Sequence, residues 1–473
     1  MTHDGRRPGD RRVRVERQRP ELITVKAPRT LRRPPTPAVV LILGFAALIA
    51  IGSFLLALPI SSASGDWTGS LNAIFTATSA VCVTGLVVVD TGTYWSGFGQ
   101  AVILALIQLG GFGFMTSSTF LLVVLTRRRT TLRDRVLVQE SLGVRHLGES
   151  TSLLKRVAIF TFLVEMTGTA ILVVHQLVRS GPGTSDLWWG AFHAISAFNN
   201  AGFDINGNYA SLVAYQRDWV VLPVIGLLIV LGGIGYAIVA DVASARRWTR
   251  MALETKVVLT TTAALLVAGA IMIGVTEWSN PATLGSLEPM DRALNAAFHS
   301  VTPRTAGFNS LEMAGFFDQT LVLTMALMFI GGASGSTAGG VKVNTFSVLG
   351  IAILSSIRGR PSAEAFGRRI PHGVVYRALS VALLFIAFAF LTALLLQALV
   401  DQPFLDTTFE TLSALGTVGL TTGITPSLSE PGKVLVAFAM FAGRLGPLTL
   451  VLALAARARA VPYRPAVETL RIG

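Results

Sequence analysis

The sequence predicts an all-α membrane protein built from four repeats around one central pore, each with a membrane span, a re-entrant loop and a second span, giving eight full spans. Three observations support this prediction. Of the 473 residues, 52% are hydrophobic and only 14% are charged. Many apolar runs reach about 20 residues, the length of a helix that crosses a ~30 Å hydrocarbon core. A short motif recurs four times between these runs, and internal repeats indicate repeated structural units.

The motif begins with Phe and reaches a glycine nine or ten residues later. Its four copies read FTATSAVCVTGL from Phe75, FHAISAFNNAGF from Phe192, FHSVTPRTAGF from Phe298 and FETLSALGTVGL from Phe409. The glycines are Gly85, Gly202, Gly307 and Gly419, and the shorter third copy contains Pro303. Each copy starts like a short helix and ends in small and polar residues. Such a segment can neither span a bilayer nor stay outside it, which predicts a re-entrant loop.

Taken in order, the chain divides into tails, repeats and linkers. We expect a tail over 1–36, repeat 1 over 37–126, a linker over 127–156, repeat 2 over 157–243, a linker over 244–256, repeat 3 over 257–354, a linker over 355–377, repeat 4 over 378–455 and a tail over 456–473. The spans are expected at Ala38–Leu58, Val102–Leu125, Val157–Val178, Val220–Ala240, Val257–Val275, Leu321–Leu354, Ala378–Val400 and Val434–Ala455. The first tail is rich in Arg and Pro, so we expect disorder near anionic lipid, or a purely topogenic role.

The basic residues predict the orientation. We count 32 Lys and Arg in the tails and linkers against five on the side of the re-entrant loops. Because cytoplasmic segments carry the excess of positive charge, both termini and all three linkers are expected in the cytoplasm. The basic residues behind the net charge of +13 therefore lie mostly between the membrane spans and do not indicate a nucleic-acid partner.

The re-entrant copies have the composition of a cation path. Four short helices would point their negative carbonyl ends at one centre. The following small residues would offer backbone oxygens that replace a hydration shell, and glycine permits the close approach of four backbones. No Asp or Glu lies within the expected lining, which favours a weakly hydrated monovalent ion such as K⁺ over Ca²⁺ or Mg²⁺.

Together with the four copies, the runs QLGGFGFMT at 108–116 and GGASGSTAGGVK at 331–342 make the chain similar to the Trk/Ktr/HKT superfamily of potassium transporters, and within it to the Ktr membrane subunits. The resemblance covers roughly residues 38–455. It implies potassium transport driven by the membrane potential, with sodium stimulation left open. A proton-coupled symporter of the Trk kind is the alternative.

The resemblance also implies the site residues. The expected ion filter comprises Val83, Thr84, Gly85, Asn200, Ala201, Gly202, Thr305, Ala306, Gly307, Thr417, Val418 and Gly419. The expected gate is an intramembrane loop with two cations, and comprises Gly331, Gly332, Ala333, Ser334, Gly335, Ser336, Thr337, Ala338, Gly339, Gly340, Lys342 and Arg444. The small residues of this loop are poor helix formers. A small-residue helix-packing patch is the other interpretation of the loop.

Three charged residues at membrane depth need an explanation. Arg444 would be costly if unpaired, so we expect it either to guard the path or to bind loop carbonyls. Arg304 lies in the third re-entrant loop, and we expect it behind the filter on carbonyls or on a carboxylate such as Asp204 or Glu410. Glu165 is either a relay or a hydrogen-bonded packing residue.

Other functional classes are disfavoured. No P-loop, dinucleotide motif or metal-ligand cluster occurs, and charged residues within the spans form no short catalytic motif, which argues against a lipid-modifying membrane enzyme. His193 and His299 occupy matching positions, where the other copies have Thr76 and Glu410, so a metal site is disfavoured. The single cysteine, Cys82, is expected to be a small side chain near the filter, and no covalent cofactor is expected.

The partners are implied by the resemblance alone. It implies a homodimer with one pore per protomer, and a KtrA-like cytoplasmic ring of regulatory subunits that carries the nucleotide. The Arg-rich linkers would contact this ring, although they could equally lie on anionic lipid.

Overall fold

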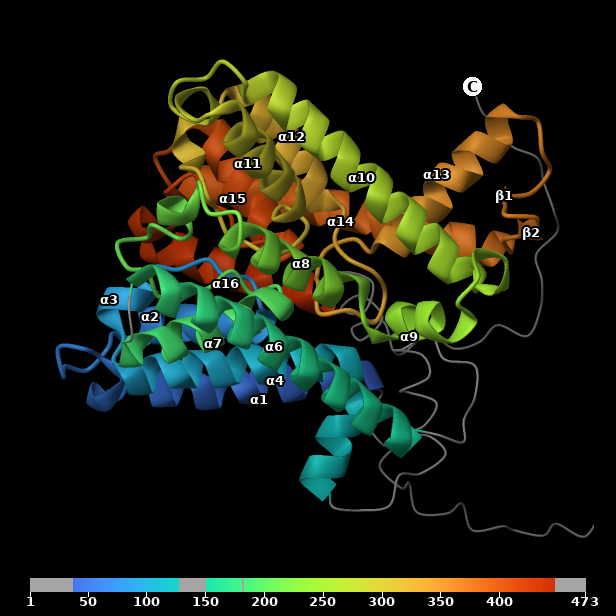
Figure 1. The fold of residues 1–473 in the computed structure, drawn as a ribbon. Coiled ribbons are helices and arrows are strands. Elements are labelled where there is room, and N and C mark those ends of the chain that lie inside the picture. Colours follow the sequence, from blue (N-terminus) through green and yellow to red (C-terminus); the bar gives the residue numbers. More distant parts are fainter. Residues whose placement is uncertain (1–36, 127–149, 181–182, 447–473) are drawn as a thin grey trace, which may run out of the picture. The chain divides into compact units, whose positions relative to one another are not determined.

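The structure is mostly helical, with a single two-stranded hairpin among the described residues. The computed structural model describes residues 37–126, 150–180 and 183–446. The predicted basic tail over 1–36, most of the linker over 127–156 and the tail over 456–473 lie outside these residues. Figure 1 labels the helices and strands.

The four long helices α1, α6, α10 and α14 open the four predicted repeats. They span Pro37–Ala57, Ser150–Ser180, Leu253–Glu277 and His372–Leu399. Each is long and apolar enough to cross a membrane. A helix that is apolar around most of its circumference is stable only in lipid or within a protein core. Many of their large side chains are exposed, including Phe54, Phe162 and Phe390, as expected for helices that contact lipid.

Four short helices follow the long ones: α2 (Ser70–Cys82), α7 (Thr184–Phe198), α11 (Pro289–Val301) and α15 (Phe404–Gly416). With 13 to 15 residues each they extend only about 20 Å, too short to cross a bilayer. Each of the first three packs closely against the long helix that precedes it, and α15 packs against both α14 and α16. The Phe that begins each motif is buried.

The helices after the short ones include two interrupted pairs. They are α4 (Gly97–Thr126), α8 (Val221–Ile234) with α9 (Tyr236–Ala245), α12 (Asp318–Phe329) with α13 (Val343–Ile357), and α16 (Glu430–Leu445). The uninterrupted span expected at Val220–Ala240 is wrong. Helix α8 ends at Ile234, and α9 leaves it at 90°. The turn is made at Gly235, whose φ of +80° suits glycine.

Four or five helices of the described chain are long and apolar enough to span, the fifth being the bent pair α8–α9. The total of eight spans therefore stays a prediction. The remaining helical elements are short: α3 (Thr91–Tyr94), η1 (Pro59–Ser61), η2 (Val213–Tyr215), η3 (Trp248–Arg250), η4 (Leu284–Ser286), η5 (Met313–Gly315) and η6 (Thr425–Ser427). The hairpin pairs β1 (Glu364–Ala365) with β2 (Arg368–Arg369), antiparallel, with Glu364 opposite Arg369.

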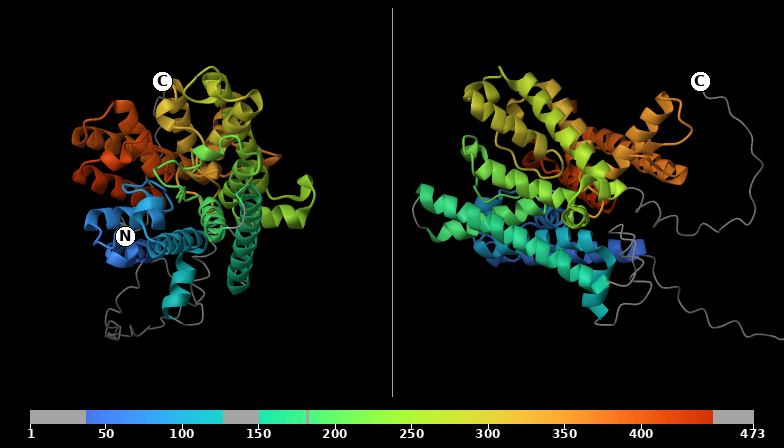
Figure 2. Two further views of the ribbon diagram at one scale, coloured as in Figure 1. Left: turned by 60° about the vertical axis from the view of Figure 1, so that its left-hand side comes forward. Right: turned by 45° about the vertical axis from the view of Figure 1, so that its right-hand side comes forward.

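One kind of contact between helices of different repeats recurs four times. The helix after a short helix packs against the short helix of the next repeat, in the pairs α4–α7, α8–α11, α12–α15 and α16–α2. The last pair closes the series, since α16 returns to the first repeat. In the left view of Figure 2 the four groups of helices follow one another around the centre in chain order.

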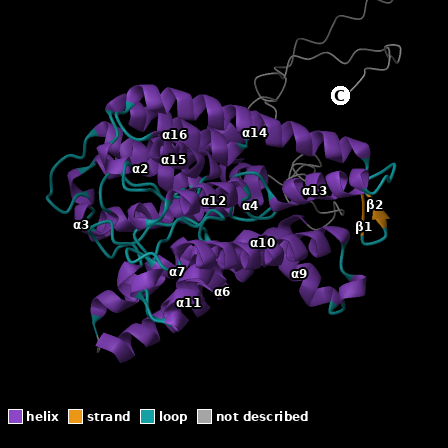
Figure 3. Cartoon of the chain, turned by 90° about the horizontal axis from the view of Figure 1, so that it is seen from above, coloured by secondary structure: helices purple, strands orange, loops and turns teal. Residues whose placement is uncertain are grey.

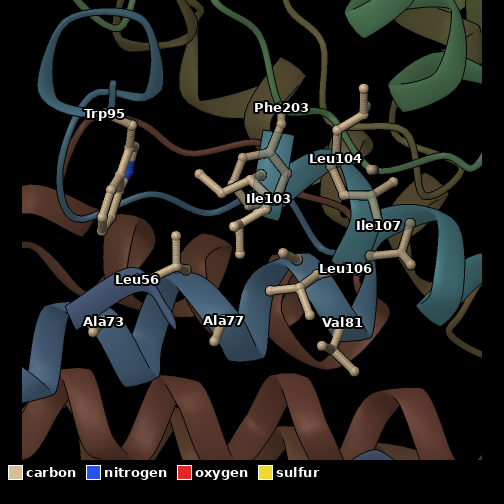
Figure 4. Packing of buried hydrophobic residues seen from close by; sticks show 14 of the residues in the cluster. Leu56, Ala73, Ala77, Val81, Trp95, Ile103, Leu104, Leu106, Ile107 and Phe203 are labelled. Carbon is tan, nitrogen blue, oxygen red and sulfur yellow. The ribbon is translucent and has the colours of Figure 1, made fainter. Parts of the chain in front are cut away.

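Buried apolar residues fill the spaces within and between these groups. In the first group Leu56 of α1, Ala77 and Val81 of α2, and Ile103 and Ile107 of α4 form one cluster (Figure 4). Phe203, which follows the glycine of the second copy, packs into the same cluster. The end of one loop is thus anchored in the core of its neighbour.

Candidate functional site

The glycines of the four copies meet at one point of the structure. A methyl group added at Gly85 would lie 2.3 Å from the carbonyl oxygen of Ala201, and one at Gly202 would lie 2.6 Å from that of Ala306. A methyl group added at Gly307 would lie 2.5 Å from the carbonyl oxygen of Val418, and one at Gly419 would lie 2.1 Å from that of Thr84. Each glycine therefore contacts the next copy, and the fourth contacts the first. We call this closed set the glycine ring.

All four copies share one backbone conformation at the ring. The glycines have φ between +71° and +94°, which only glycine adopts readily. The residues two positions earlier also have positive φ: Val83, Asn200, Thr305 and Thr417. A left-handed conformation is uncommon for any residue other than glycine, and strained for a β-branched one such as Val or Thr. Its recurrence at matching positions indicates that the surrounding structure imposes it.

A hydroxyl residue four positions after each Phe holds the ring in place, and our sequence analysis did not single it out. These residues are Ser79, Ser196, Thr302 and Ser413. In each copy their backbone oxygen accepts a hydrogen bond from the residue before the glycine, at 2.8 to 2.9 Å. All four copies have Ser or Thr at this same position, and this recurrence could have identified these residues from the sequence.

The side-chain hydroxyls act differently in different copies. Ser79 and Ser413 accept hydrogen bonds from the N–H groups of Gly85 and Gly419, both at 3.1 Å. Ser196 instead donates to the carbonyl oxygen of Phe203 at 2.7 Å. Thr302 likewise donates to the carbonyl oxygen of Phe308 at 2.6 Å. The first and fourth copies therefore share one pattern, and the second and third share the other.

A cavity of about 370 Å³ lies against the glycine ring, and all four glycines line it. Its walls also include three carboxylate side chains, those of Asp90, Asp204 and Glu312, and no Lys or Arg. The sequence analysis named Asp204 only as a possible partner of Arg304 and did not predict this group. We call the cavity the acidic vestibule. Three carboxylates without a basic neighbour in the lining attract cations to its entrance.

The carboxylates of the vestibule differ in their surroundings. Asp90 accepts from the N–H of Thr93 at 2.8 Å and, through its other oxygen, from the N–H of Tyr209 at 2.7 Å, which ties the loops of the first two repeats together. Burial raises the pKa of Asp204 to about 7, the nearby charge of Asp90 adds to the increase, and the N–H of Asn206 opposes it. Asp204 therefore titrates near neutral pH.

The loop expected to be the gate lies against Thr305 and Thr417, at which two of the four expected filter segments begin. A methyl group on Gly339 would meet the Thr417 hydroxyl at 1.9 Å, and one on Gly331 would lie 3.3 Å from the Thr305 methyl. The loop is also bonded to the interruption in the second repeat, since the N–H of Ala333 donates to Gly233 at 2.8 Å. Its ends join through the N–H of Gly331 and the oxygen of Val341, 2.9 Å apart.

Three cationic side chains hold this loop by its carbonyl oxygens. Arg444 is buried and donates to the oxygens of Thr337 at 2.5 Å and Gly110 at 3.1 Å. Lys342 donates to Ala338 and, at 3.4 Å, to Gly339. These bonds agree with the structural interpretation of Arg444 and do not test a guarding role. Arg304 donates to the Gly331 oxygen at 3.2 Å, so its predicted contact with a carbonyl is found, and no carboxylate of the described residues pairs with it.

The remaining polar candidates have ordinary structural surroundings. Glu165 accepts from Asn199 at 3.0 Å and from Gln108 at 3.2 Å, which links α6, α7 and α4 in one buried network. His193 bonds to the backbone oxygen of Trp189 at 2.8 Å. Within the described residues no group of His, Cys, Asp and Glu could hold a metal ion. Cys82 is buried at the end of α2, directly before Val83, the first residue of the expected filter.

The fold and the site together define a helical membrane protein in which four short loops meet at one ring. A family model for cation transport proteins, TrkH, matches residues 21–460. The Ktr system potassium uptake protein B of Bacillus subtilis is 42% identical over 421 residues, covering 89% of this chain and 93% of that protein. The potassium/sodium uptake protein NtpJ of Enterococcus hirae is 37% identical, covering 94% and 98%.

The fold is similar to a solved structure of the same family. The crystal structure of the potassium transporter TrkH from Vibrio parahaemolyticus matches with a TM-score of 0.68 at 18% identity, covering 90% of this chain and 86% of that one. This chain belongs to the TrkH family of cation transport proteins. The resemblance stated from the sequence motifs is confirmed, and the family is one of transporters and not of enzymes.

Proposed function

We propose that this chain takes up potassium across the plasma membrane, through a pore whose ion filter is formed by the glycine ring. The observation that carries the proposal is the mutual contact of four glycines, one from each re-entrant copy. Relatives named as potassium uptake proteins, at 37% and 42% identity, support the choice of ion. One relative named for both potassium and sodium leaves sodium stimulation open.

Backbone oxygens are the proposed ligands of the ion. In each copy the residue before the glycine places its carbonyl oxygen beside the glycine of the preceding copy, and the first copy places its own beside the glycine of the fourth. A ring of such oxygens can replace the hydration shell of K⁺ without a fixed negative charge. The acidic vestibule would then concentrate cations in front of the ring. A driving force of about 100 mV contributes about 2.3 kcal/mol per charge, enough for roughly 50-fold accumulation without ATP.

The proposed path crosses the membrane between four repeats with eight spans and with both termini in the cytoplasm. The 39 Lys and Arg residues, concentrated in tails and linkers, favour this orientation. The acidic vestibule would then face outward and the gate loop inward of the filter. A homodimer and a cytoplasmic nucleotide-binding regulator belong to the proposal as well, and relatives named as parts of a "Ktr system" support a partner subunit.

Flux into liposomes containing the purified protein tests the proposal. We expect valinomycin-independent K⁺ uptake when the membrane potential is inside-negative, with smaller Na⁺ uptake under the same conditions. The proton-coupled alternative predicts a reversal potential that shifts with pH at constant K⁺, and the channel-like proposal predicts none. Folded protein that carries neither ion, with and without a regulatory partner, would contradict the proposed function.

A further inference from the structure

A second large cavity lies at the opposite end of the helices from the acidic vestibule. It has a volume of about 880 Å³ and is enclosed by α9, the start of α10, α13, the β1–β2 hairpin and the start of α14. Figure 3 shows the hairpin and α9 at the end of the molecule's helices away from α3. Helix α9 runs at 90° to α8. If α8 crosses the membrane, α9 runs parallel to the membrane surface, and the cavity beside it is at the height of the lipid head groups.

The cavity has an apolar wall and a basic rim. Ile238, Val348, Ile351 and Val374 line it from three helices. Arg250, Arg368 and Arg369 line it from η3 and from the hairpin. Apolar side chains beside guanidinium groups match an amphiphilic anion, because its chain contacts the former and its head group the latter.

The arginines of the rim are available for a ligand. Within the part of the chain that the structure describes, their side chains make no hydrogen bond or ion pair, and all three are exposed. The two acidic residues of the cavity are already engaged. Asp241 accepts from the N–H of Ala252 at 3.0 Å and from Thr255, and Glu254 accepts from Asn344 at 2.6 Å.

Exposed aromatic side chains lie close to the rim arginines. Trp248 of η3 and Phe366 at the hairpin turn pack edge to face with centroids 6.1 Å apart, although each is nearly half exposed. Both are within two residues of a rim arginine. Aromatic residues that remain exposed beside basic ones are typical of the membrane interface. Tyr376, on the first turns of α14, is also exposed there.

We propose that this cavity binds an anionic phospholipid, with Arg250, Arg368 and Arg369 holding its phosphate and the apolar wall holding the upper part of its acyl chains. Guanidinium groups bind phosphate oxygens in pairs, which favours arginine at such a site. The apolar wall and the exposed aromatic residues favour a lipid over a soluble phosphate compound or an acidic protein segment. The proposal depends on the chain's membrane location and not on the proposed potassium path.

Native mass spectrometry of the purified full chain can test the site with phosphatidylglycerol, phosphatidylcholine and soluble glycerol phosphate as probes. We expect phosphatidylglycerol to remain bound, and the triple variant Arg250→Gln, Arg368→Gln, Arg369→Gln to retain at least tenfold less of it. The triple lysine variant, which keeps the charge, should retain an intermediate amount. A matched control, Arg247→Gln with Arg358→Gln and Arg377→Gln, changes three exposed arginines outside the cavity lining and should bind as the wild type does.

Three results would overturn the proposal. These are equal retention of phosphatidylglycerol by folded glutamine and wild-type proteins, equal retention of phosphatidylcholine and phosphatidylglycerol, and displacement of the lipid by glycerol phosphate at the same concentration. If the glutamine variant keeps the lipid but loses a regulatory partner, the cavity is a protein-docking site instead. Because the measurement is of binding, its outcome is independent of ion flux.

Discussion

At the residue scale, the site depends on positions where a side chain cannot be added. The four ring glycines combine positive φ with backbone neighbours at 2.1 to 2.6 Å from any added methyl group. Any other residue would have to adopt an unfavourable positive φ, and its Cβ atom would lie too close to the backbone of the neighbouring copy. Gly85 and Gly419 have the same φ of +94° and the closest neighbours, so we expect the first and fourth copies to tolerate the least change.

Replacing Gly85 by Ser should weaken the preference for potassium over sodium. The new side chain would meet the carbonyl oxygen of Ala201, which must move from its place in the ring. A loss of about 1.4 kcal/mol in relative free energy lowers the selectivity ratio tenfold. Relative K⁺ and Na⁺ flux in liposomes measures it. Gly97→Ser, at a position with open space around the glycine, is the control. Unchanged selectivity in folded Gly85→Ser protein would remove this residue from the filter.

Thr302 offers a matched pair of substitutions. Thr302→Val keeps the shape and removes the hydroxyl that binds the Phe308 oxygen, whereas Thr302→Ser keeps the hydroxyl. A buried oxygen left without a donor costs about 1–3 kcal/mol, so the valine variant should unfold at lower temperature and select less well. The serine variant should resemble the wild type in both measurements. If valine and serine variants behave alike, the hydroxyl does not position the ring.

Asp204 should make cation uptake depend on external pH. Its pKa of about 7 means that the carboxyl is mostly neutral at pH 6 and mostly charged at pH 8. Uptake at low external K⁺ should therefore rise as the pH passes through about 7, because the acidic vestibule gains a negative charge. Asp204→Asn should remove this rise, and Asp66→Asn, in an exposed loop, should keep it. A wild-type profile that is flat between pH 6 and 8 would contradict the assignment.

The same shift has a consequence for stability. A carboxyl whose pKa is higher in the folded than in the unfolded protein binds its proton more tightly when folded. Asp204 therefore favours the folded state most at low pH, and this contribution declines as the pH rises from about 4 to about 7. Unfolding temperatures of wild type and Asp204→Asn should converge in acid and separate at pH 8, with the variant more stable.

At the element scale, the interrupted helices matter most. The loop between α12 and α13 is bonded to the break between α8 and α9, and Arg444 joins it to α4. Residues of repeats 1, 2 and 4 thus hold the loop of repeat 3 in place. If the loop has a second arrangement whose free energy differs from that of the observed one by only a few kcal/mol, a regulator could switch the loop between the two.

Changing Arg444 to Gln, or deleting several residues of 331–340, should raise flux and weaken its dependence on a regulator, with ion preference kept. The substitution removes the donors to Thr337 and Gly110, which releases the loop from α4. Liposome flux with and without the regulator measures the effect, and Lys433→Gln on the vestibule side of α16 serves as the control. If a folded loop deletion leaves flux and regulation unchanged, the gate lies elsewhere.

At the scale of the whole molecule, the sequence predicted the four copies and their order, because a repeated motif is visible in one dimension. It could not predict the 90° turn at Gly235, since apolar residues continue on both sides of the break. The acidic vestibule was also missed. Asp90 and Glu312 each follow their glycine by five residues, whereas Asp204 follows its glycine by two, so the three carboxylates share no common register in the sequence. The loop contacts of Arg444 likewise join residues more than 100 positions apart.

Cysteine labelling should establish the orientation of the chain. In a Cys82→Ser background, single cysteines at Asp66 and Asp401 should react with an impermeant thiol reagent added to intact cells. Cysteines at Arg250 and Arg360 should react only after permeabilisation. All four positions are exposed, so access to the reagent depends on the side of the membrane. The reverse pattern would place the acidic vestibule in the cytoplasm and contradict uptake through it.

The four ring segments belong to one polypeptide, and this has an evolutionary consequence. In a ring of identical subunits, one codon change alters every quarter of the opening at once. Here one codon change alters the sequence of a single quarter and acts on the others only through the contacts between neighbouring copies. The first and fourth copies have already diverged from the second and third in the direction of their hydroxyl bonds. If the ring is the proposed ion filter, mutation can therefore change its four quarters one at a time.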